Sequence, residues 1–110
     1  WYSPLPMCLY NPIARGLGNK SCAACDGLLS IAPDGGLLPC PSWPEALGNL
    51  ARDGFERLWF SEAAAWFKEK RYAPDSCRAC SSFTACQAAC PLYWKGVGYA
   101  ELENRKEACR

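Results

Sequence analysis

The sequence predicts a small α+β domain that contains a β-hairpin, two short helices and loop-rich segments. Three observations support this fold class. A Pro-Asp-Gly-Gly turn separates two short apolar runs, a later stretch repeats large apolar residues every three or four positions, and many of the cysteines are crowded into segments that show neither period. The length of 110 residues fits one domain or a fragment of a larger protein.

The hairpin is predicted from a turn between two apolar runs. The runs at about 28–32 and 37–40 flank Pro-Asp-Gly-Gly at 33–36. Proline favours the second position of a turn and glycine accepts a positive φ angle, so this segment is typical of a β-hairpin. Such a hairpin would bring Cys25 and Cys40 together at its open end, where they could share a metal site. The alternative is an ordinary hairpin with two buried thiols.

Two short helices are predicted after the hairpin, at about 52–60 and 62–71. Ser61 followed by Glu62 is typical of an N-cap and an acidic first turn, which separates the two helices. Pro74 ends any extension of the second helix. The apolar residues near helical spacing are Phe55, Leu58, Trp59, Ala63, Trp66 and Phe67. We interpret this aromatic stripe as core packing.

Both ends of the chain are predicted to be less regular. Residues 1–18 contain three prolines and two glycines and should be irregular. Residues 91–98 should begin as a loop because they contain two glycines. A short helix from about Ala100 should then deliver Cys109 near the C-terminus.

Composition excludes several classes of function. The chain has 12 lysines and arginines against 11 aspartates and glutamates, so its net charge of +1 offers no strong attraction to nucleic acid or to a membrane surface. No apolar run approaches the roughly 18 residues that a membrane span needs. The chain starts at Trp1 without a signal-peptide pattern, so we expect it to continue a longer protein.

Cysteine is the residue that indicates the chemistry, because nine cysteines occur in a chain without histidine. They are Cys8, Cys22, Cys25, Cys40, Cys77, Cys80, Cys86, Cys90 and Cys109. Disulfides suit small secreted chains, but the odd count and the crowded Cys-x2-Cys pairs argue against them. Zinc can be held by four cysteines without histidine, and iron–sulfur clusters are held mainly by thiolates. The pattern therefore predicts a metal-stabilised domain and leaves zinc and iron–sulfur clusters open.

The spacing of seven cysteines and one glycine carries a resemblance to a known family. The pattern C-x9-G-x4-C, a gap, C-x2-C-x5-C-x3-C, a gap, and C is matched by Cys25, Gly35, Cys40, Cys77, Cys80, Cys86, Cys90 and Cys109. The sequence resembles the SPASM domain, the C-terminal auxiliary-cluster domain of many radical S-adenosylmethionine enzymes. The resemblance implies a lead-in from a preceding domain at residues 1–21 and a SPASM-like domain at 22–110.

The resemblance implies two auxiliary 4Fe–4S clusters whose ligands interleave along the chain. The first cluster would be bound by Cys25, Cys40 and Cys90, and the second by Cys77, Cys80, Cys86 and Cys109. The first cluster then needs a fourth ligand from upstream. We assign Cys22, with Cys8 as its rival, because the shorter loop costs less closure entropy. This choice leaves Cys8 outside both ligand sets.

The resemblance also implies the function. The expected role is to carry two auxiliary clusters for electron transfer and substrate engagement in a radical enzyme that modifies a peptide or protein. The C-x3-C-x2-C spacing of the radical-generating site is absent, because Tyr93 stands where a cysteine would have to follow Cys86 and Cys90. The fragment is therefore not expected to be catalytic alone. S-adenosylmethionine would bind only in a missing catalytic domain, which would be the partner of this one.

The competing interpretation is a zinc-stabilised module that binds a peptide or protein. Iron and sulfide content would separate the two interpretations, since a zinc module is colourless. Under the cluster interpretation we expect a reducing, low-oxygen cytoplasm and no nucleic-acid or membrane partner.

Overall fold

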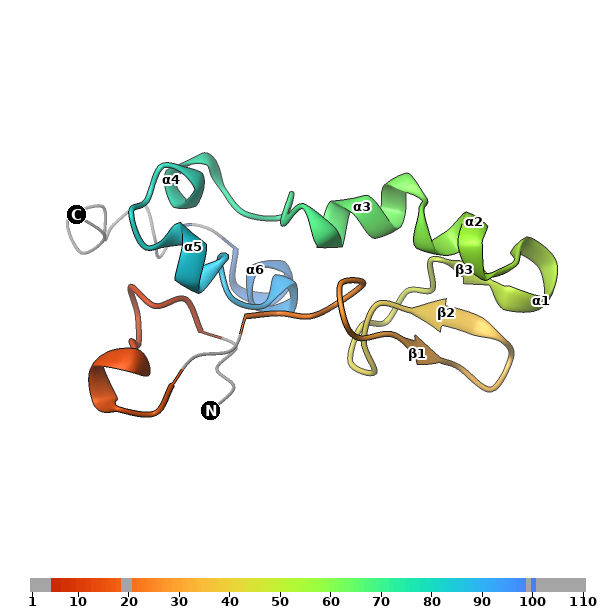
Figure 1. The fold of residues 1–110 in the computed structure, drawn as a ribbon, viewed down its shortest axis with the longest axis horizontal. Coiled ribbons are helices and arrows are strands. Elements are labelled where there is room, and N and C mark those ends of the chain that lie inside the picture. The colour runs from red at the N-terminus through yellow and green to blue at the C-terminus, as the bar shows by residue number, and fades with distance from the viewer. Residues whose placement is uncertain (1–4, 19–20, 99, 101–110) are drawn as a thin grey trace. The chain divides into compact units, whose positions relative to one another are not determined.

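The computed structural model of the chain describes residues 5–18, 21–98 and 100. Two compact units make up the chain, one formed by Ala23–Arg71 and the other by the segments before and after it. The described residues form three short strands in one antiparallel sheet and six short α-helices (Figure 1). The predicted α+β class is therefore confirmed.

The hairpin unit, Ala23–Arg71, is built on the three-stranded sheet. Strands β1 (Ser30–Ile31) and β2 (Gly36–Leu38) form the predicted hairpin, and β3 (Gly48–Asn49) pairs with the other edge of β2. Both pairings are antiparallel. The sequence analysis does not predict β3, because a strand of two residues is too short to show an alternating pattern.

The hairpin turn is held by local hydrogen bonds and by one side chain from β3. Asp34 Oδ1 accepts a hydrogen bond from the Gly36 N–H at 2.9 Å, and Gly35 adopts a φ angle of 86°. The Asn49 Nδ2 donates to the Asp34 carbonyl at 2.7 Å. Asn49 Oδ1 accepts from the Ala51 N–H at 3.0 Å and thereby caps the following helix. One side chain thus joins the turn, the sheet edge and the first helix.

The helical stretch contains three helices instead of the two that the sequence predicts. They are α1 (Leu50–Asp53), α2 (Phe55–Trp59) and α3 (Glu62–Lys68). The single helix predicted at about 52–60 is wrong, because Gly54 adopts φ 75° and ψ 156° and breaks the helical path. Ser61 caps α3 as predicted, and its side chain accepts a hydrogen bond from the Ala64 N–H at 3.2 Å.

Aromatic side chains form the core of the hairpin unit. The rings of Trp43 and Phe67 meet edge to face with their centroids 5.0 Å apart. Trp66 joins this cluster with its ring centroid 6.1 Å from that of Trp43, and Leu37 of β2 is fully buried. The prediction that the stripe is core packing is confirmed for Leu58 and Phe67, which are buried, and is wrong for Phe55 and Ala63, which are exposed; Trp59 and Trp66 are half-buried.

The terminal unit combines Trp1–Cys22 with Tyr72–Arg110. Its described elements are the 3-10 turn η1 (Ile13–Arg15) and the helices α4 (Asp75–Arg78), α5 (Phe83–Cys86) and α6 (Pro91–Val97). Apart from η1, the described part of the lead-in is irregular, as predicted.

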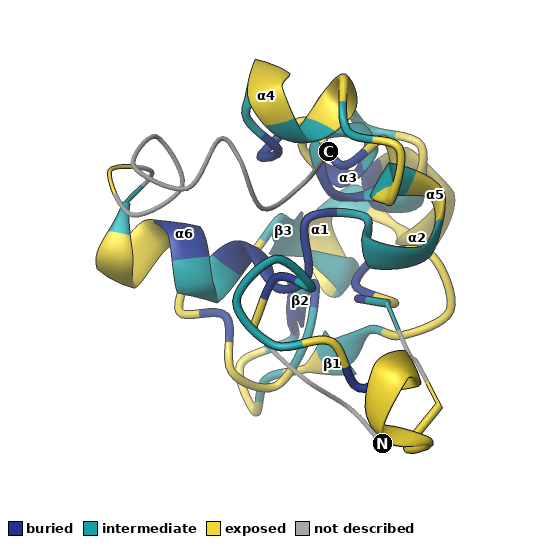
Figure 2. Cartoon of the chain, turned by 90° about the vertical axis from the view of Figure 1, so that its left-hand side faces the viewer, coloured by how far each residue is buried: buried dark blue, intermediate teal, exposed yellow. Residues whose placement is uncertain are grey.

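Helix α6 corrects the prediction of a loop at residues 91–98. Pro91 occupies the first helical position, where its missing N–H costs nothing. Pro91 and Trp94 are buried, and Figure 2 shows the helix buried toward its start and exposed toward its end. Burial of this face outweighs the poor helix propensity of Gly96. Cys109 and nearly all of the helix predicted from about Ala100 lie outside the described residues.

Three consecutive residues between α5 and α6 adopt left-handed backbone conformations. Gln87, Ala88 and Ala89 have φ angles of 49°, 58° and 57°. This conformation costs a non-glycine residue roughly 1–2 kcal/mol. Trp94 holds the segment by donating from its Nε1–H to the Ala88 carbonyl at 2.7 Å. Tyr72 donates from its hydroxyl to the Ala89 carbonyl at 3.2 Å, so two buried aromatic side chains compensate the strain.

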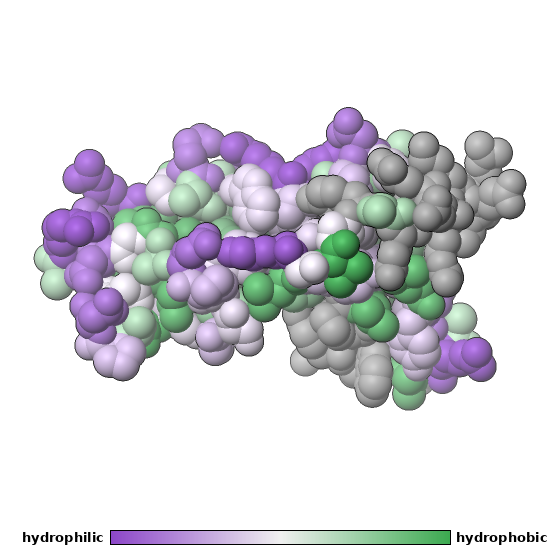
Figure 3. All heavy atoms as spheres, turned by 180° about the vertical axis from the view of Figure 1, so that it is seen from behind, coloured by the Kyte–Doolittle hydropathy of each residue, from purple (hydrophilic) through white to green (hydrophobic). Residues whose placement is uncertain are grey.

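Surface character agrees with the mixed composition of the sequence. The face that Figure 3 shows carries both hydrophilic and hydrophobic residues. Across the described part of the chain, no helix combines the length and the apolar character that crossing a membrane requires.

We predict that Gly48→Ala destabilises the protein by about 1–3 kcal/mol, which is typical of an overpacked site. The new Cβ would overlap Leu58 Cδ2 and lie 2.9 Å from Asp53 Oδ2. Urea unfolding of anaerobically prepared protein measures the change. The matched control is Gly27→Ala, whose Cβ meets only the Ala23 Cβ at 4.0 Å and should change stability by less than about 0.5 kcal/mol. Equal stability of the two variants would contradict the close packing at Gly48.

We predict that Gln87→Gly stabilises the protein, because glycine adopts the left-handed conformation without the steric cost of a Cβ. The expected gain in the free energy of unfolding is about 1 kcal/mol. Gln87→Val should have the opposite effect, since a β-branched side chain is disfavoured at positive φ. Thermal unfolding of the wild-type protein and of the two variants measures their order of stability. A loss of stability in the glycine variant would contradict the strained turn.

Candidate functional site

Eight of the nine cysteines lie in the described part of the chain, and all eight are thiols that form no disulfide. Cys22, Cys25 and Cys90 are buried. The five half-buried ones are Cys8, Cys40, Cys77, Cys80 and Cys86. All eight thiols are thus at least partly shielded from bulk water.

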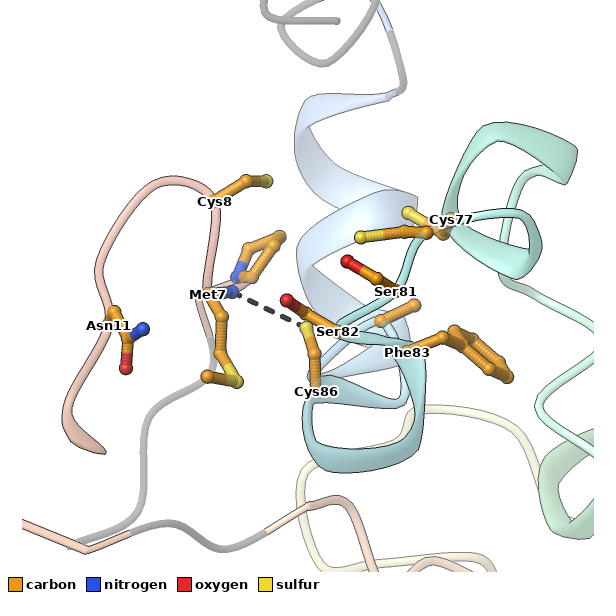
Figure 4. Close-up of a pocket in the computed structure, with 11 residues that line it drawn as sticks. Met7, Cys8, Asn11, Cys77, Ser81, Ser82, Phe83 and Cys86 are labelled. Atoms are coloured by element: carbon orange, nitrogen blue, oxygen red, sulfur yellow. Dashed lines mark hydrogen bonds between the residues drawn. The ribbon is translucent and has the colours of Figure 1, made fainter. Parts of the chain in front are cut away.

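The crowded cysteines of the second predicted ligand set converge on one cavity. Cys77 lies in α4, Cys80 follows it by three residues, and Cys86 is the last residue of α5. The Cys80 N–H donates to the Cys77 carbonyl at 3.1 Å, which closes one tight turn and keeps these two residues close together. All three line a cavity of about 120 Å³ (Figure 4). The C-x2-C-x5-C segment therefore contributes three thiols to the wall of one cavity, and their role as ligands of one cluster stays a prediction.

A fourth cysteine lines the same cavity, and the sequence analysis does not place it there. Cys8 reaches the cavity from the N-terminal segment, and Figure 4 shows its side chain extending toward the side where Cys77 lies. Next to it, the Met7 N–H donates a hydrogen bond to Cys86 Sγ at 3.3 Å. No spacing rule links Cys8 to residues almost 70 positions away, and the sequence analysis considers it only as the rival of Cys22 for the first cluster.

The chemistry of the cavity wall is that of a thiolate site. The residues that line it include no histidine and no carboxylate, and its polar side chains besides the thiols are Asn11, Ser81 and Ser82. Sulfur is thus the only strong metal ligand available, a donor set that fits an all-cysteine cluster or an all-cysteine zinc site. Four sulfurs around a cavity suit a polynuclear cluster, because each thiolate then binds a different iron.

Burial and the neighbouring thiolates raise the pKa of Cys77 to about 11. Burial is the largest cause, followed by the negative charges of Cys8, Cys86 and Cys80. Without a bound cation, the Cys77 thiol therefore keeps its proton at neutral pH. A bound metal would replace that proton, so metal uptake by this cavity releases protons and is favoured as pH rises.

The first predicted ligand set is divided between the two units. Cys25 and Cys40 belong to the hairpin unit, whereas Cys22 and Cys90 belong to the terminal unit. Cys25 is fully buried with a φ angle of 55°, and its N–H donates to the Leu28 carbonyl at 2.9 Å. The four-residue set therefore stays a prediction, as does the role of Cys109 outside the described residues.

The hairpin determines where along the chain Cys25 and Cys40 stand relative to its two strands. Ser30 pairs with Leu38 at the open end of the hairpin, and the two cysteines lie just before β1 and just after β2. Because the two strands are antiparallel, the segment that enters β1 and the segment that follows β2 are both at the open end of the hairpin, and each of them contains one of the two cysteines. In residues 5–18, 21–98 and 100, no three histidine, cysteine, aspartate or glutamate side chains meet closely enough to hold a single metal ion.

The hairpin unit also has a more open hollow of about 500 Å³. Trp43, Trp66 and Phe67 give it an apolar wall, and no cysteine lines it. Arg71 at its edge forms ion pairs with Glu62 at 2.8 Å and with Glu69 at 2.7 Å. The hollow therefore combines an apolar wall with a charged edge.

Comparison with curated proteins and with solved structures gives no match to the chain. Residues 22–81, more than half of the chain, match the SPASM family, which is described as an iron–sulfur cluster-binding domain. The matched residues include both hairpin cysteines and the Cys77–Cys80 pair, while Cys8 and Cys86 lie outside them. Together with the thiol-lined cavity, this match shows that the chain belongs to the SPASM family of iron–sulfur cluster-binding domains.

Proposed function

We propose that the chain is the auxiliary domain of a radical S-adenosylmethionine enzyme and carries two 4Fe–4S clusters. The observation that carries the proposal is the cavity lined by four cysteines in a member of an iron–sulfur cluster-binding family. Cysteine thiolates are the usual ligands of such clusters, four to each. A bound cluster would supply one-electron transfer to or from the substrate radical of the parent enzyme.

The residues around the cavity have distinct roles under this proposal. Cys77, Cys80 and Cys86 hold the second cluster, and the Met7 N–H stabilises negative charge on Cys86 Sγ. Hydrogen bonds to cluster sulfurs and solvent exposure set the reduction potential of a cluster. Phe83 is an apolar residue of the cavity lining, next to the polar side chains of Ser81 and Ser82. The hydrogen bond from the Met7 N–H to Cys86 Sγ is therefore one means by which the protein would tune the cluster.

The first cluster is proposed to use the two hairpin cysteines together with Cys22 and Cys90. The left-handed run from Gln87 to Ala89 supports such a division of ligands, because it redirects the backbone between Cys86 and Cys90. Neighbouring cysteines can then serve different clusters, as happens in two-cluster ferredoxins. The resemblance assigns Cys109 as the fourth ligand of the second cluster.

The parent enzyme is proposed to act on a peptide or protein in the reducing cytoplasm. Its S-adenosylmethionine site would lie in a separate catalytic domain, so the chain itself is not the catalyst. The aromatic hollow of the hairpin unit supports a role in substrate engagement, because apolar side chains and fixed charges converge there. The same hollow would serve a zinc-stabilised peptide-binding module, which is the competing function.

We predict that the anaerobically reconstituted chain is brown and binds about eight irons and a matching amount of acid-labile sulfide, as two 4Fe–4S clusters require. Iron, sulfide and zinc analysis on the same preparation measures this. A colourless protein that takes up zinc but never iron and sulfide would establish the binding-module alternative.

We predict that the two proposed sites fill independently. Cys77→Ala together with Cys80→Ala should remove about four irons, and Cys25→Ala together with Cys40→Ala should remove the other four. Iron content and the electron paramagnetic resonance signal of the reduced protein measure the loss from each double variant. If either double variant lost all iron while remaining folded by circular dichroism, the two-site proposal would fail.

A further inference from the structure

We propose that Tyr72 and Trp94 are positioning residues that hold the Cys86 and Cys90 thiols in a fixed mutual orientation and thereby set the interaction between the two clusters. This inference rests on the proposed function, in which these two cysteines serve different clusters. It goes beyond the ligand assignment, because neither aromatic residue is a ligand. Its consequence is that the magnetic interaction between the two reduced clusters should depend on the two aromatic side chains.

A short and tightly turned piece of chain joins Cys86, the last residue of α5, to Cys90, the N-cap of α6. Only three residues separate them, so their Cα atoms would be at most roughly 14 Å apart even in a fully extended chain. The left-handed turn formed by Gln87, Ala88 and Ala89 shortens this span, because the Ala89 N–H donates to the Cys86 carbonyl at 2.9 Å. Two clusters bound through these cysteines are therefore close neighbours, whatever completes each ligand set.

Aromatic side chains contact all three carbonyl groups of the left-handed turn. The Tyr72 hydroxyl lies 3.4 Å from the Gln87 carbonyl oxygen and 3.2 Å from the Ala89 carbonyl oxygen. The Trp94 Nε1–H donates to the Ala88 carbonyl, which lies between them in the chain, at 2.7 Å. One of these side chains precedes α4 and the other belongs to α6, so the turn is held by residues on both sides of it in the sequence.

These contacts select one backbone path between the two cysteines. Residues that carry a Cβ disfavour the left-handed region, so this turn is not the path that its own three residues would prefer. Tyr72 and Trp94 are buried, and bulk water does not replace their hydrogen bonds. A change of φ within the turn alters the relative direction of the Cys86 and Cys90 side chains, because both are attached to the same short backbone.

Removing a single hydroxyl tests this role. Tyr72→Phe keeps the ring, and both the variant and the wild-type protein are loaded anaerobically and should contain about eight irons, because every proposed ligand remains. Reduced clusters are paramagnetic, so in the fully reduced wild-type protein each cluster should split the electron paramagnetic resonance signal of the other. We expect a changed splitting in Tyr72→Phe. An identical splitting in the two proteins would overturn the proposal.

Two control variants separate positioning from stability. Tyr93→Phe removes a hydroxyl from a half-buried neighbour and leaves the three carbonyl contacts of the turn in place, so it should keep the wild-type splitting. Gly48→Ala should lower stability by overpacking in the hairpin unit and should also keep the wild-type splitting. If Gly48→Ala changed the splitting as much as Tyr72→Phe, the effect would be one of general stability and the proposal would be wrong.

Further variants keep the test decisive. Trp94→Phe removes the indole N–H and should also change the splitting. If Tyr72→Phe does not fold by itself, the same change is made in the Gln87→Gly background, which should be more stable, and is compared with Gln87→Gly alone. The variants that keep only one cluster supply reference spectra without the interaction.

The wild-type protein distinguishes this inference from the proposed function. A wild-type chain with about eight irons and no splitting would overturn the inference and leave the two-cluster function standing. A wild-type chain that binds about four irons, or only zinc, would overturn the two-cluster function and this inference with it.

Discussion

Four thiols from distant parts of the chain line one small cavity. The terminal unit must therefore hold two segments together that lie far apart in the sequence. Its helices have only four to seven residues, and helices this short are not stable by themselves in water. They are held by contacts that run across the sequence, such as the hydrogen bond from Met7 to Cys86 and those from Tyr72 to the backbone beyond α5. A bound cluster would add covalent bonds across the same contacts, so metal binding and folding are two aspects of one process.

The strained segment before Cys90 fits this view. Left-handed residues other than glycine persist only where the surrounding structure fixes them, and here Trp94 and Tyr72 are buried against the segment. The strained segment therefore fixes the path of the backbone between Cys86, the last residue of α5, and Cys90, which precedes α6.

Local signals in the sequence predicted those elements whose stability is local. The Pro-Asp-Gly-Gly turn gave the hairpin, and Ser61 gave the start of α3, because each acts through residues next to it. The sequence analysis failed mainly where contacts between distant residues determine the local structure. Burial of Trp94 made a helix of a glycine-containing loop. The break at Gly54 is different, because it is a local backbone effect that the helical spacing of its neighbours concealed. Cys8 reaches its neighbours only through the tertiary fold, so the sequence supplied three of the four thiols that line the cavity and missed the fourth.

The terminal unit is formed by two segments that are separated in the sequence, and this has a consequence for the order in which the protein can fold during synthesis. Ala23–Arg71 is one continuous stretch, so the hairpin unit can fold as soon as it leaves the ribosome. Residues 5–18 emerge earlier but must wait for the segment after Tyr72 before they find their partners. During synthesis the Cys8 turn therefore cannot make its hydrogen bond to Cys86 until Cys86 has been added, and its thiol lacks that protection for the same interval. The order of translation sets a time window in which the future cavity is open to oxidation.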